Sequence, residues 1–591
     1  MSTPSTLVEA FFARTTADAD RVALRRKHLG LWEELTFAEY AERVEAVSRA
    51  LVELGVAPGT PVGLIAENRP EWLFTDLGII AAGAVTCAIY TTSSPEQIGY
   101  ILSHCGAKVV VVENEEQLDK LLVVRESHPI DHIVVMDEKG LATFSDPGVR
   151  SFDAVLELGR NSDVDLAERR AAIRGDDLAI LVYTSGTTGP PKGVMLSHTN
   201  IIWACHALKT AAGAFADDEF LSFLPLCHIA ERIVTVFHQI VNGSVVSFAE
   251  ALDTVADNLA EVRPSFLFAV PRIWEKMMNG VELRMREATW FKQRMYAWAL
   301  EVGREANVCR REGRAPPSAY AAADRLVLLP LRDKLGLDRV RMAATGAAPI
   351  SPEVVDYFQA IGVPLVEVYG QTESSAVITL NSPGFRAPGK VGEPAEGLEL
   401  RLAEDGEILA KGPGVMLGYF DEAEATARTV QDGWLHTGDV GELDDEGQLH
   451  ITDRKKDLII TAGGKNVAPQ YIESKLRTSA YVHDAIVIGD GRKFLTALIV
   501  LDEDNLIAWA QRERVQFGAY AELAKSPDVL RLIDEEVSAV NKTLTHVEAL
   551  KRFTILERRL DTDEGELTPT LKVRRKVIAE KYADAIEAMY R

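Results

Sequence analysis

Short apolar runs alternate with segments of helical periodicity through the first part of the chain. Four strand-length runs lie at 62–66, 85–90, 109–112 and 132–137, and residues 72–82 carry apolar side chains at helical spacing. Buried strands that alternate with helices are typical of parallel sheets covered by helices. The pattern therefore predicts an α/β fold.

The pattern changes after the charged stretch DRKKD, residues 453–457. A helical segment, two neighbouring strand-like runs and a charged helical region follow it, at 469–476, 485–490, 494–502 and 502–550. This order favours a small α+β unit. We place the boundary at the charged stretch, which gives an N-terminal domain of residues 1–454 and a C-terminal domain of residues 455–591.

A long segment at about 278–340 interrupts the N-terminal domain. It is rich in Arg, Ala, Leu and Trp, with apolar residues at helical spacing. The spacing predicts a helical hairpin, with helices over 280–305 and 321–335 and a loop containing Gly and Pro at 313–317.

Trp274, Met277 and Met278 lie at the start of this insert and have two interpretations. They line an apolar tunnel, or they are ordinary core residues. A cluster of Trp and Met is more often core.

The composition is that of an ordinary globular protein, and the charge limits its partners. The 591 residues are 47% hydrophobic and 26% charged, with a net charge of −24 at pH 7. Such charge argues against a nucleic-acid partner and gives no general attraction to anionic membranes.

The longest uncharged apolar run, 77–90, is too short to span a bilayer, and residues 1–20 lack the apolar core of a secretion signal. The five scattered cysteines show no CxxC pair, as expected in a reducing compartment. We expect a cytoplasmic protein whose only membrane contact is peripheral.

A loop suited to polyphosphate follows a buried run at 178–182. Its sequence, YTSGTTGPPKG at 183–193, supplies hydroxyl donors, glycines that let backbone N–H groups approach an anion, and one lysine. It is not a Walker A loop, because Pro191 precedes the lysine and Gly193 follows it. The residues that we expect to contact the phosphates are Thr184, Ser185, Gly186, Thr187, Thr188, Gly189 and Lys192.

A second candidate segment, EVYGQTESS at 367–375, follows another apolar run. Tyr369 offers an aromatic face for a purine, Thr372 a hydroxyl for a phosphate oxygen, and Glu373 a carboxylate for Mg²⁺, which prefers one or two carboxylates plus phosphate oxygens. Gly370 and Gln371 complete this part of the expected nucleotide site.

Two further segments add contacts for a nucleotide. Asp439 in WLHTGDVG and Arg454 form a carboxylate and guanidinium pair that suits a ribose diol. Alone, each is more often a turn aspartate or a surface ion-pair partner. The small residues Gly346, Ala347 and Ala348 allow an adenine or acyl-phosphate to lie against the backbone, although a tight turn at a helix start explains them equally well.

These motifs resemble, in order, those of the acyl-adenylate-forming (AMP-binding) superfamily, which includes acyl-CoA synthetases, luciferases and peptide-synthetase adenylation domains. The fifth motif is GELTPTLKVRRK at 565–576, with Lys572 at the position of the adenylation lysine. Leu571 replaces the Gly usual outside the long-chain group. The LPLCHIAER segment around His228 and the long insert also resemble long-chain fatty acyl-CoA synthetases.

The resemblance, from about residue 7 to 585, implies a large N-terminal domain with parallel sheets and a distorted β-barrel, and a small mobile lid. It implies activation of a long-chain fatty acid with ATP and Mg²⁺, pyrophosphate release, and transfer of the acyl group to coenzyme A. Catalytic roles fall on Lys572, Glu373 and His228, the last between adenylate and acyl pocket. Thr184 joins Glu373 at the metal.

In the same family the lid turns about a hinge, which is Lys456 in this sequence. Gly463 and Gly464 match the residues that line the pantetheine path during thioester formation. Lys572 serves the first half-reaction and this glycine pair the second.

Three alternatives stay open at this stage. The first is a fatty acyl-AMP ligase that loads an acyl carrier protein. The second is a non-catalytic nucleotide or acyl-ligand binder, which would be expected to lack Lys572 or Glu373. The third and least favoured is a luciferase-like oxygenase. The sequence sets neither an acyl-chain length nor an oligomeric state.

Overall fold

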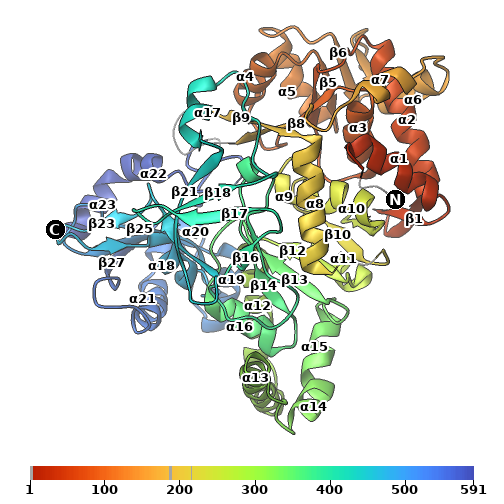
Figure 1. Cartoon of the computed structure of the whole chain (residues 1–591). Helices are drawn as coiled ribbons and strands as arrows, with labels where there is room; N and C mark the ends of the chain where they lie inside the picture. The colour runs from red at the N-terminus through yellow and green to blue at the C-terminus, as the bar shows by residue number, and fades with distance from the viewer. Residues whose placement is uncertain (1–3, 185–189, 214–215, 563, 571) are drawn as a thin grey trace.

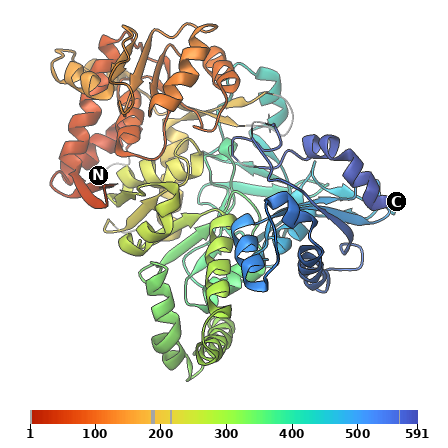
Figure 2. The ribbon, with the colours of Figure 1, turned by 180° about the vertical axis from the view of Figure 1, so that it is seen from behind.

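The computed structural model describes residues 4–184, 190–213, 216–562, 564–570 and 572–591. Figures 1 and 2 show the N-terminal segments at the top, the helical insert at the bottom and the C-terminal segments to one side. The predicted α/β class is confirmed by sheets that carry helices on their faces.

The largest sheet has the strand order β19-β9-β8-β4-β3-β5-β6-β7. Its strands are β3 (Pro61–Ile65), β4 (Val85–Ala88), β5 (Val109–Val112), β6 (His132–Val135), β7 (Val149–Ser151), β8 (Leu178–Thr184), β9 (Lys192–Ser197) and β19 (Gly418–Tyr419). Strands β3 to β8 are parallel, as predicted, whereas β9 and β19 are antiparallel at one edge. Helix α3 (Pro70–Ala81) is buried along its whole length, which confirms the helix predicted over 72–82.

Two smaller sheets lie between this sheet and the insert. One has the order β10-β11-β1-β2 and the other the order β12-β13-β14. Their bounds are β1 (Val22–His28), β2 (Leu31–Thr36), β10 (Glu219–Ser222), β11 (Val245–Phe248), β12 (Phe266–Ala269), β13 (Met342–Thr345) and β14 (Leu365–Glu367). Because β13 and β14 are parallel neighbours, the segments that follow them, at Gly346 and Tyr369, leave the sheet at the same edge.

A five-stranded antiparallel sheet forms the curled part that was expected as a distorted barrel. Its strands are β17 (Glu399–Leu402), β18 (Glu407–Lys411), β20 (Val430–Gln431), β21 (Trp434–Leu443) and β22 (Leu449–Arg454). The long strand β21 pairs with β18, β20 and β22, so that it lies at the centre of the sheet.

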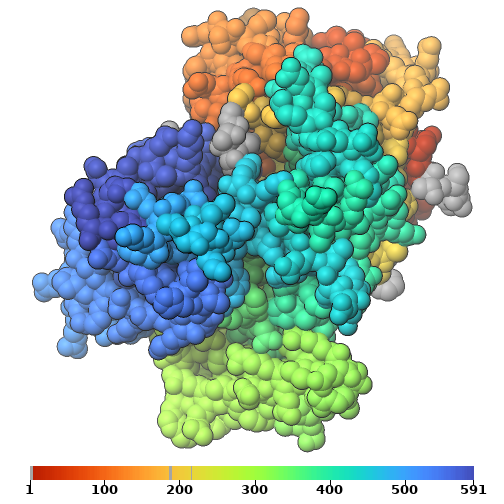
Figure 3. Space-filling model, turned by 60° about the vertical axis from the view of Figure 1, so that its left-hand side comes forward, coloured from red at the N-terminus to blue at the C-terminus, as the bar shows by residue number. Residues whose placement is uncertain are grey.

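The insert is helical, but its first predicted helix is wrong in its bounds. Residues 280–305 divide between α12 (Pro271–Arg286) and α13 (Trp290–Arg311), because Thr289 adopts an extended conformation and begins a new helix. The chain returns through α14 (Tyr320–Ala323), the π-helical turn η3 (Asp324–Leu328) and α15 (Leu329–Lys334). Figure 3 shows this segment projecting from the body of the molecule.

Trp274 and Met278 belong to the apolar core beneath the insert. The indole of Trp274 is fully buried and packs edge-on against Phe358, with 4.8 Å between ring centroids. This favours the core interpretation over the tunnel.

The C-terminal part has an apolar core of its own. It contains the hairpin β23 (Ile459–Ile460) and β24 (Asn466–Val467), and the sheet β25 (Val482–Ile488), β26 (Leu495–Leu501) and β27 (Leu550–Ile555). Its helices are α18 (Pro469–Leu476), α19 (Glu503–Glu513), α20 (Tyr520–Lys525), α21 (Pro527–Asn541), α22 (Arg575–Lys581) and α23 (Ala583–Tyr590). The exact boundary after residue 454 stays a prediction. Among the described residues, no helix is both long and apolar enough to cross a membrane.

Candidate active site

Asp439 and Arg454 meet because they are register partners on the antiparallel strands β21 and β22. The Arg454 Nε lies 3.5 Å from Asp439 Oδ1. The carboxylate is buried, whereas the guanidinium is partly exposed. A ligand with hydroxyl groups can therefore find an acceptor and a donor side by side, although fifteen residues separate them in the sequence.

Two side chains from the segment after β14 orient Asp439. The Tyr369 hydroxyl donates to Asp439 Oδ2 at 2.7 Å, and the Gln371 amide donates to the same oxygen at 2.6 Å. Burial, followed by the charge of Asp439, raises the pKa of Tyr369 well above its usual value, so the phenol stays a donor. The Tyr369 ring packs in an apolar cluster, and stacking of this ring on a purine stays a prediction.

Glu373 is held by a residue that the sequence did not indicate. The Tyr419 hydroxyl donates to Glu373 Oε1 at 2.8 Å. Tyr419 lies on β19, which pairs with β9, and the Lys192 ammonium lies 5.1 Å from the centroid of its ring. Tyr419 therefore links the phosphate-loop strand to the predicted metal ligand. In the sequence, Gly418-Tyr419 is typical of an ordinary turn and gives no indication of a contact with Glu373.

The predicted phosphate loop joins two neighbouring antiparallel strands. Thr184, the last residue of β8, is the register partner of Lys192, the first residue of β9. The loop residues Ser185, Gly186, Thr187, Thr188 and Gly189 lie outside the described residues. Both ends of the loop are therefore placed next to each other at the edge where β8 ends.

The small residues after β13 lie at the expected edge. Gly346 is buried, Ala347 is half-buried with a φ of 65°, and Ala348 is exposed. Gly370 is required sterically, since a Cβ there would lie 2.0 Å from the carbonyl oxygen of Ala376. The backbone next to Tyr369 therefore turns closely on itself, and Thr372 begins a short 3₁₀ turn that carries Glu373.

Lys572 comes from the C-terminal part on a tight turn. The Lys572 N–H donates to the Thr568 hydroxyl at 3.1 Å, and the Thr568 N–H donates to the Lys572 carbonyl at 2.8 Å. The turn touches the N-terminal part, because the Thr92 hydroxyl donates to the Pro569 carbonyl at 3.1 Å. The structure thus holds the turn against the region where the nucleotide motifs gather.

The pKa of Lys572 depends on charged groups of the N-terminal part. Lys572 is exposed to solvent, but nearby protein atoms partly desolvate its ammonium. Desolvation and the positive charge of Arg454 lower its pKa to about 8, against the attraction of Asp439 and Glu373. Burial and the charge of Lys572 lower the pKa of His228 to about 4. The imidazole of His228 is therefore neutral at pH 7, and its Nδ1 accepts from the Ala230 N–H at 3.3 Å.

Other residues expected to act in the C-terminal part lie elsewhere. Lys456 is exposed in the turn that follows β22. Gly463 and Gly464 lie exposed at the tip of the β23–β24 hairpin, where Gly464 has a φ of 71°. Figure 1 places this hairpin near α23, at the outer side of the C-terminal part. The structure does not bring the glycine pair to Lys572.

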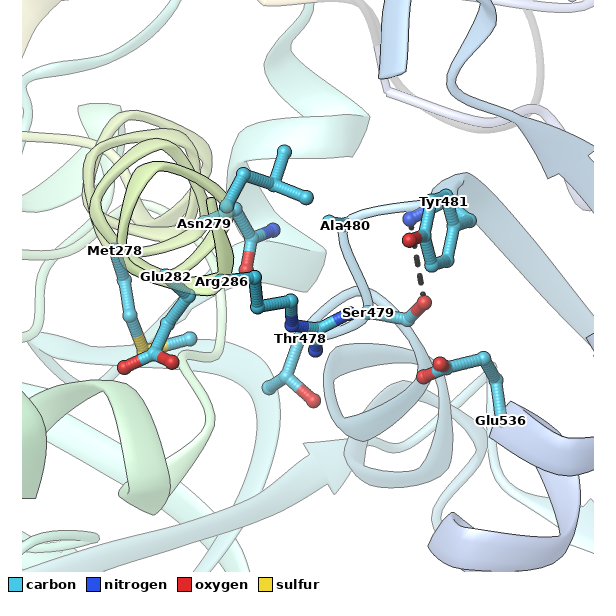
Figure 4. A pocket seen from close by; sticks show the side chains of 10 residues that line it. Met278, Asn279, Glu282, Arg286, Thr478, Ser479, Ala480, Tyr481 and Glu536 are labelled. Atoms are coloured by element: carbon cyan, nitrogen blue, oxygen red, sulfur yellow. Dashed lines mark hydrogen bonds between the residues drawn. The ribbon is translucent and has the colours of Figure 1, made fainter. Parts of the chain in front are cut away.

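Ion pairs below the site join the two parts of the molecule. Arg272 contacts Asp502 at 3.3 Å, and the fully buried Glu275 contacts Arg477 at 3.7 Å. Burial raises the pKa of Glu275 above its usual value. Beside these pairs, a cavity of about 120 Å³ separates α12 from the segment 478–481 and α21, and Figure 4 shows Arg286 and Glu536 at its walls. The interface is therefore polar and incompletely packed.

A magnesium ion fits this arrangement only with help from a ligand. Glu373 has one carboxylate oxygen that accepts no hydrogen bond in the described part of the chain, and no group of three His, Cys, Asp or Glu side chains there is suited to a metal. Mg²⁺ takes few protein carboxylates and completes its coordination with phosphate oxygens and water. The donor set therefore suits an ion that arrives with a polyphosphate.

Comparison with known families decides what the chain is. A model of the AMP-binding enzymes matches residues 11–420, and a model of the AMP-binding enzyme C-terminal domain matches residues 456–591. The chain belongs to the AMP-binding enzymes. The resemblance predicted from the motifs is thereby confirmed.

Two named relatives of this AMP-binding enzyme match over nearly its whole length. It is 36% identical to the long-chain-fatty-acid–CoA ligase FadD15 of Mycobacterium bovis, over 98% of its own length and 96% of that protein. It is 34% identical to the long-chain-fatty-acid–CoA ligase ACSBG2 of Xenopus laevis, over 99% of its length and 84% of that protein.

Solved structures agree on the fold. The adenylation domain of a carboxylate reductase from Mycobacterium chelonae has a TM-score of 0.78 at 21% identity, covering 99% of this chain and 91% of that chain. The anthranilate CoA ligase AuaEII with anthranoyl-AMP has a TM-score of 0.75 at 21% identity, covering 100% and 99%. The predicted N-terminal domain with a smaller C-terminal domain is thus an architecture found in adenylate-forming enzymes.

Proposed function

We propose that this AMP-binding enzyme activates a long-chain fatty acid with ATP and transfers the acyl group to coenzyme A. An ionised acid resists attack by a thiol. One of its oxygens attacks the α-phosphorus of ATP, the bond to pyrophosphate breaks, and acyl-AMP forms. The CoA thiolate then attacks the acyl carbon, and AMP leaves with the bonding electrons. The carboxylates and phosphates on this path are anionic, so the enzyme must mainly position and neutralise charge.

The residues divide this work according to their chemistry. Asp439, fixed by Tyr369 and Gln371, accepts hydrogen bonds from the ribose hydroxyls, and Arg454 donates beside it. Lys572 places its ammonium between the fatty-acid carboxylate and the α-phosphate.

The hydroxyls of the phosphate loop and Lys192 donate to the outer phosphates. The imidazole of His228, whose pKa is lowered by burial and by the charge of Lys572, is neutral and separates the adenylate from the acyl chain. A neutral side chain at this point adds no charge that would hold the fatty-acid carboxylate away from the phosphate.

The residues present also fit the expected metal. Glu373 and Thr184 supply hard oxygen donors at the edge where the phosphates would lie. When bound, Mg²⁺ supplies neutralisation of the phosphate charge. Tyr419 keeps the Glu373 carboxylate in one orientation.

The observation that carries the proposal is the position of Lys572. This lysine comes from the far end of the chain, yet its pKa responds to Arg454, Asp439 and Glu373. An ammonium at this place can neutralise the charge of the reacting carboxylate and α-phosphate, as adenylation requires. The names of the relatives support the fatty-acid substrate and the CoA acceptor, so a ligase for a carrier protein is not favoured.

The test is pyrophosphate release by the purified protein with ATP, Mg²⁺ and saturated acids from butanoate to eicosanoate, with and without CoA. We expect CoA-dependent turnover that is greatest with dodecanoate or a longer acid. A single turnover that CoA does not extend would instead indicate a carrier-protein ligase. No pyrophosphate with any acid would contradict the proposed function.

A further inference from the structure

The start of helix α13 carries an unusual group of exposed aromatic side chains. Trp290 is 70% exposed, Phe291 62% and Trp298 37%, and the rings of Trp290 and Phe291 stack with centroids 6.2 Å apart. Residues four apart on a helix lie on the same side, so Trp290, Arg294 and Trp298 share one face. Large apolar side chains that gather on a surface mark an interaction site.

Two basic residues lie between these aromatic residues along the helix. Lys292 and Arg294 are exposed and form no ion pair within the described residues. The first turn of α13 contains no acidic residue, although a helix N-terminus favours anions and disfavours cations. Cations in the first turn therefore do not stabilise helix α13, but they can bind an external anion. We call Trp290, Phe291, Lys292, Arg294 and Trp298 the insert patch.

The charge of the insert is opposite to that of the whole protein. Residues 278–340 contain twelve Lys or Arg and eight Asp or Glu, a net charge of +4, whereas the whole chain carries −24. Leu326 and Leu329, 64% and 40% exposed, lie on the returning helical segment that packs against α13. In Figures 2 and 3 this segment projects from the body, so a flat surface can reach it without meeting the acidic remainder.

We propose that the insert patch docks the enzyme on an anionic lipid bilayer. Trp side chains favour the boundary between headgroups and acyl chains, and Lys or Arg beside them bind anionic headgroups. The docking rests on the proposed function in one respect, because long-chain fatty acids partition into membranes and the enzyme would take its substrate there.

The test is co-sedimentation of the full-length protein with vesicles, without ATP or CoA. Vesicles of phosphatidylcholine alone are compared with vesicles that hold equal parts of phosphatidylcholine and phosphatidylglycerol. We expect binding to the anionic vesicles that weakens as salt is raised. Lys292→Glu with Arg294→Glu should lower the partition coefficient by roughly fivefold or more for each residue. Trp290→Ala with Phe291→Ala should lower it about tenfold or more.

The matched control removes equally exposed apolar side chains elsewhere. Leu31 and Leu252 are 73% and 70% exposed and lie outside the insert. Leu31→Ala with Leu252→Ala should leave vesicle binding unchanged. Equal loss in this control, binding that ignores the insert variants, or no binding at all would overturn the proposal. So would light scattering that shows a wild-type dimer converted to monomer by the aromatic variant, because a second copy would then cover the patch.

Failure of this proposal is distinguishable from failure of the proposed function. The insert variants should keep wild-type turnover with octanoate, which is dispersed in water, and lose turnover with acids supplied in anionic vesicles. A wild-type protein that forms no acyl-CoA from any acid would contradict the ligase while leaving the vesicle result valid.

Discussion

The two sides of the candidate site are built in different ways. Asp439 and Arg454 are register partners in one sheet, and hydrogen bonds from Tyr369 and Gln371 fix the carboxylate. Lys572 lies on a turn of the C-terminal part and reaches the site through few contacts, one of them from Thr92 to Pro569. The first side is preorganised by backbone pairing. The second exists only while the C-terminal part keeps this position.

This difference has a functional meaning. In the proposed function, a site whose ribose contacts are fixed and whose lysine moves with the C-terminal part can retain the adenylate while the lysine leaves. The polar, incompletely filled interface around Glu275 and Arg272 is consistent with such movement. Changes on the fixed side should therefore affect both half-reactions, and changes to the lysine should affect one.

The largest effect is expected for the movable side. Lys572→Ala removes the ammonium that we propose neutralises the reacting carboxylate and phosphate, and acyl-CoA formation should fall by about a hundredfold or more. Steady-state kinetics with a long-chain acid measure this loss. Lys576→Ala is the matched control, since Lys576 is an exposed lysine four residues on, and it should leave kcat/KM unchanged. A similar loss in both variants would mean that the turn is merely destabilised.

The fixed side should respond next. Asp439→Asn replaces a carboxylate that accepts two hydrogen bonds from the protein, and a bond to a charged group contributes about 1.5 to 3 kcal/mol. We expect kcat/KM for ATP to fall by roughly tenfold to a hundredfold. Tyr369→Phe, which removes one of these bonds, should lower it by a smaller factor. Equal effects of the two substitutions would show that the phenol does more than orient Asp439.

The pH profile sharpens the comparison. Lys572 has a pKa of about 8, so its ammonium is charged below that value and is lost as the pH rises through it. kcat/KM for ATP should therefore fall about tenfold between neutral pH and about pH 9. In Lys572→Arg the side chain keeps its charge at higher pH, so the alkaline decrease of kcat/KM should move to higher pH even if the maximum rate is lower. An unchanged alkaline decrease would mean that another group causes it.

The smallest effect is expected at the interface. Asp502→Asn breaks the ion pair with Arg272 but keeps a side chain that caps helix α19. A partly exposed pair contributes about 1 kcal/mol or less, so the rate of adenylation should fall by about two- to fivefold through the loss of this position. Asp528→Asn, which breaks the exposed pair with Arg531 on α21, is the control and should have no effect.

Much of the site was predictable from the sequence, because the chemistry lies in short motifs at the ends of strands. The side chains that suit a nucleotide and its metal were recognisable by their chemistry: Asp439, Arg454, Glu373 and Lys572. Their meeting was not predictable from spacing, since it depends on the register of β21 with β22 and on the position of the C-terminal part. Tyr419 was missed because only the pairing of β19 with β9 brings it to Glu373.

The fold shows the same limit. Short continuous apolar runs such as 109–112 predicted strands correctly, since a strand buried on both faces requires continuous apolar sequence. The break between α12 and α13 was missed because Ala288 is a strong helix former and Thr289 is only a weak one, so neither residue signals the end of a helix. The extended conformation of Thr289, which separates the two helices, has no strong sequence signal.

The most direct test is single-turnover kinetics of the two half-reactions in Lys572→Ala and Asp439→Asn side by side. Adenylation is measured as pyrophosphate release, and thioester formation as conversion of supplied acyl-AMP with CoA. We predict that Lys572→Ala loses adenylation and keeps thioester formation, whereas Asp439→Asn is impaired in both. Equal loss of both half-reactions in Lys572→Ala would contradict a lysine that serves one step from a movable domain.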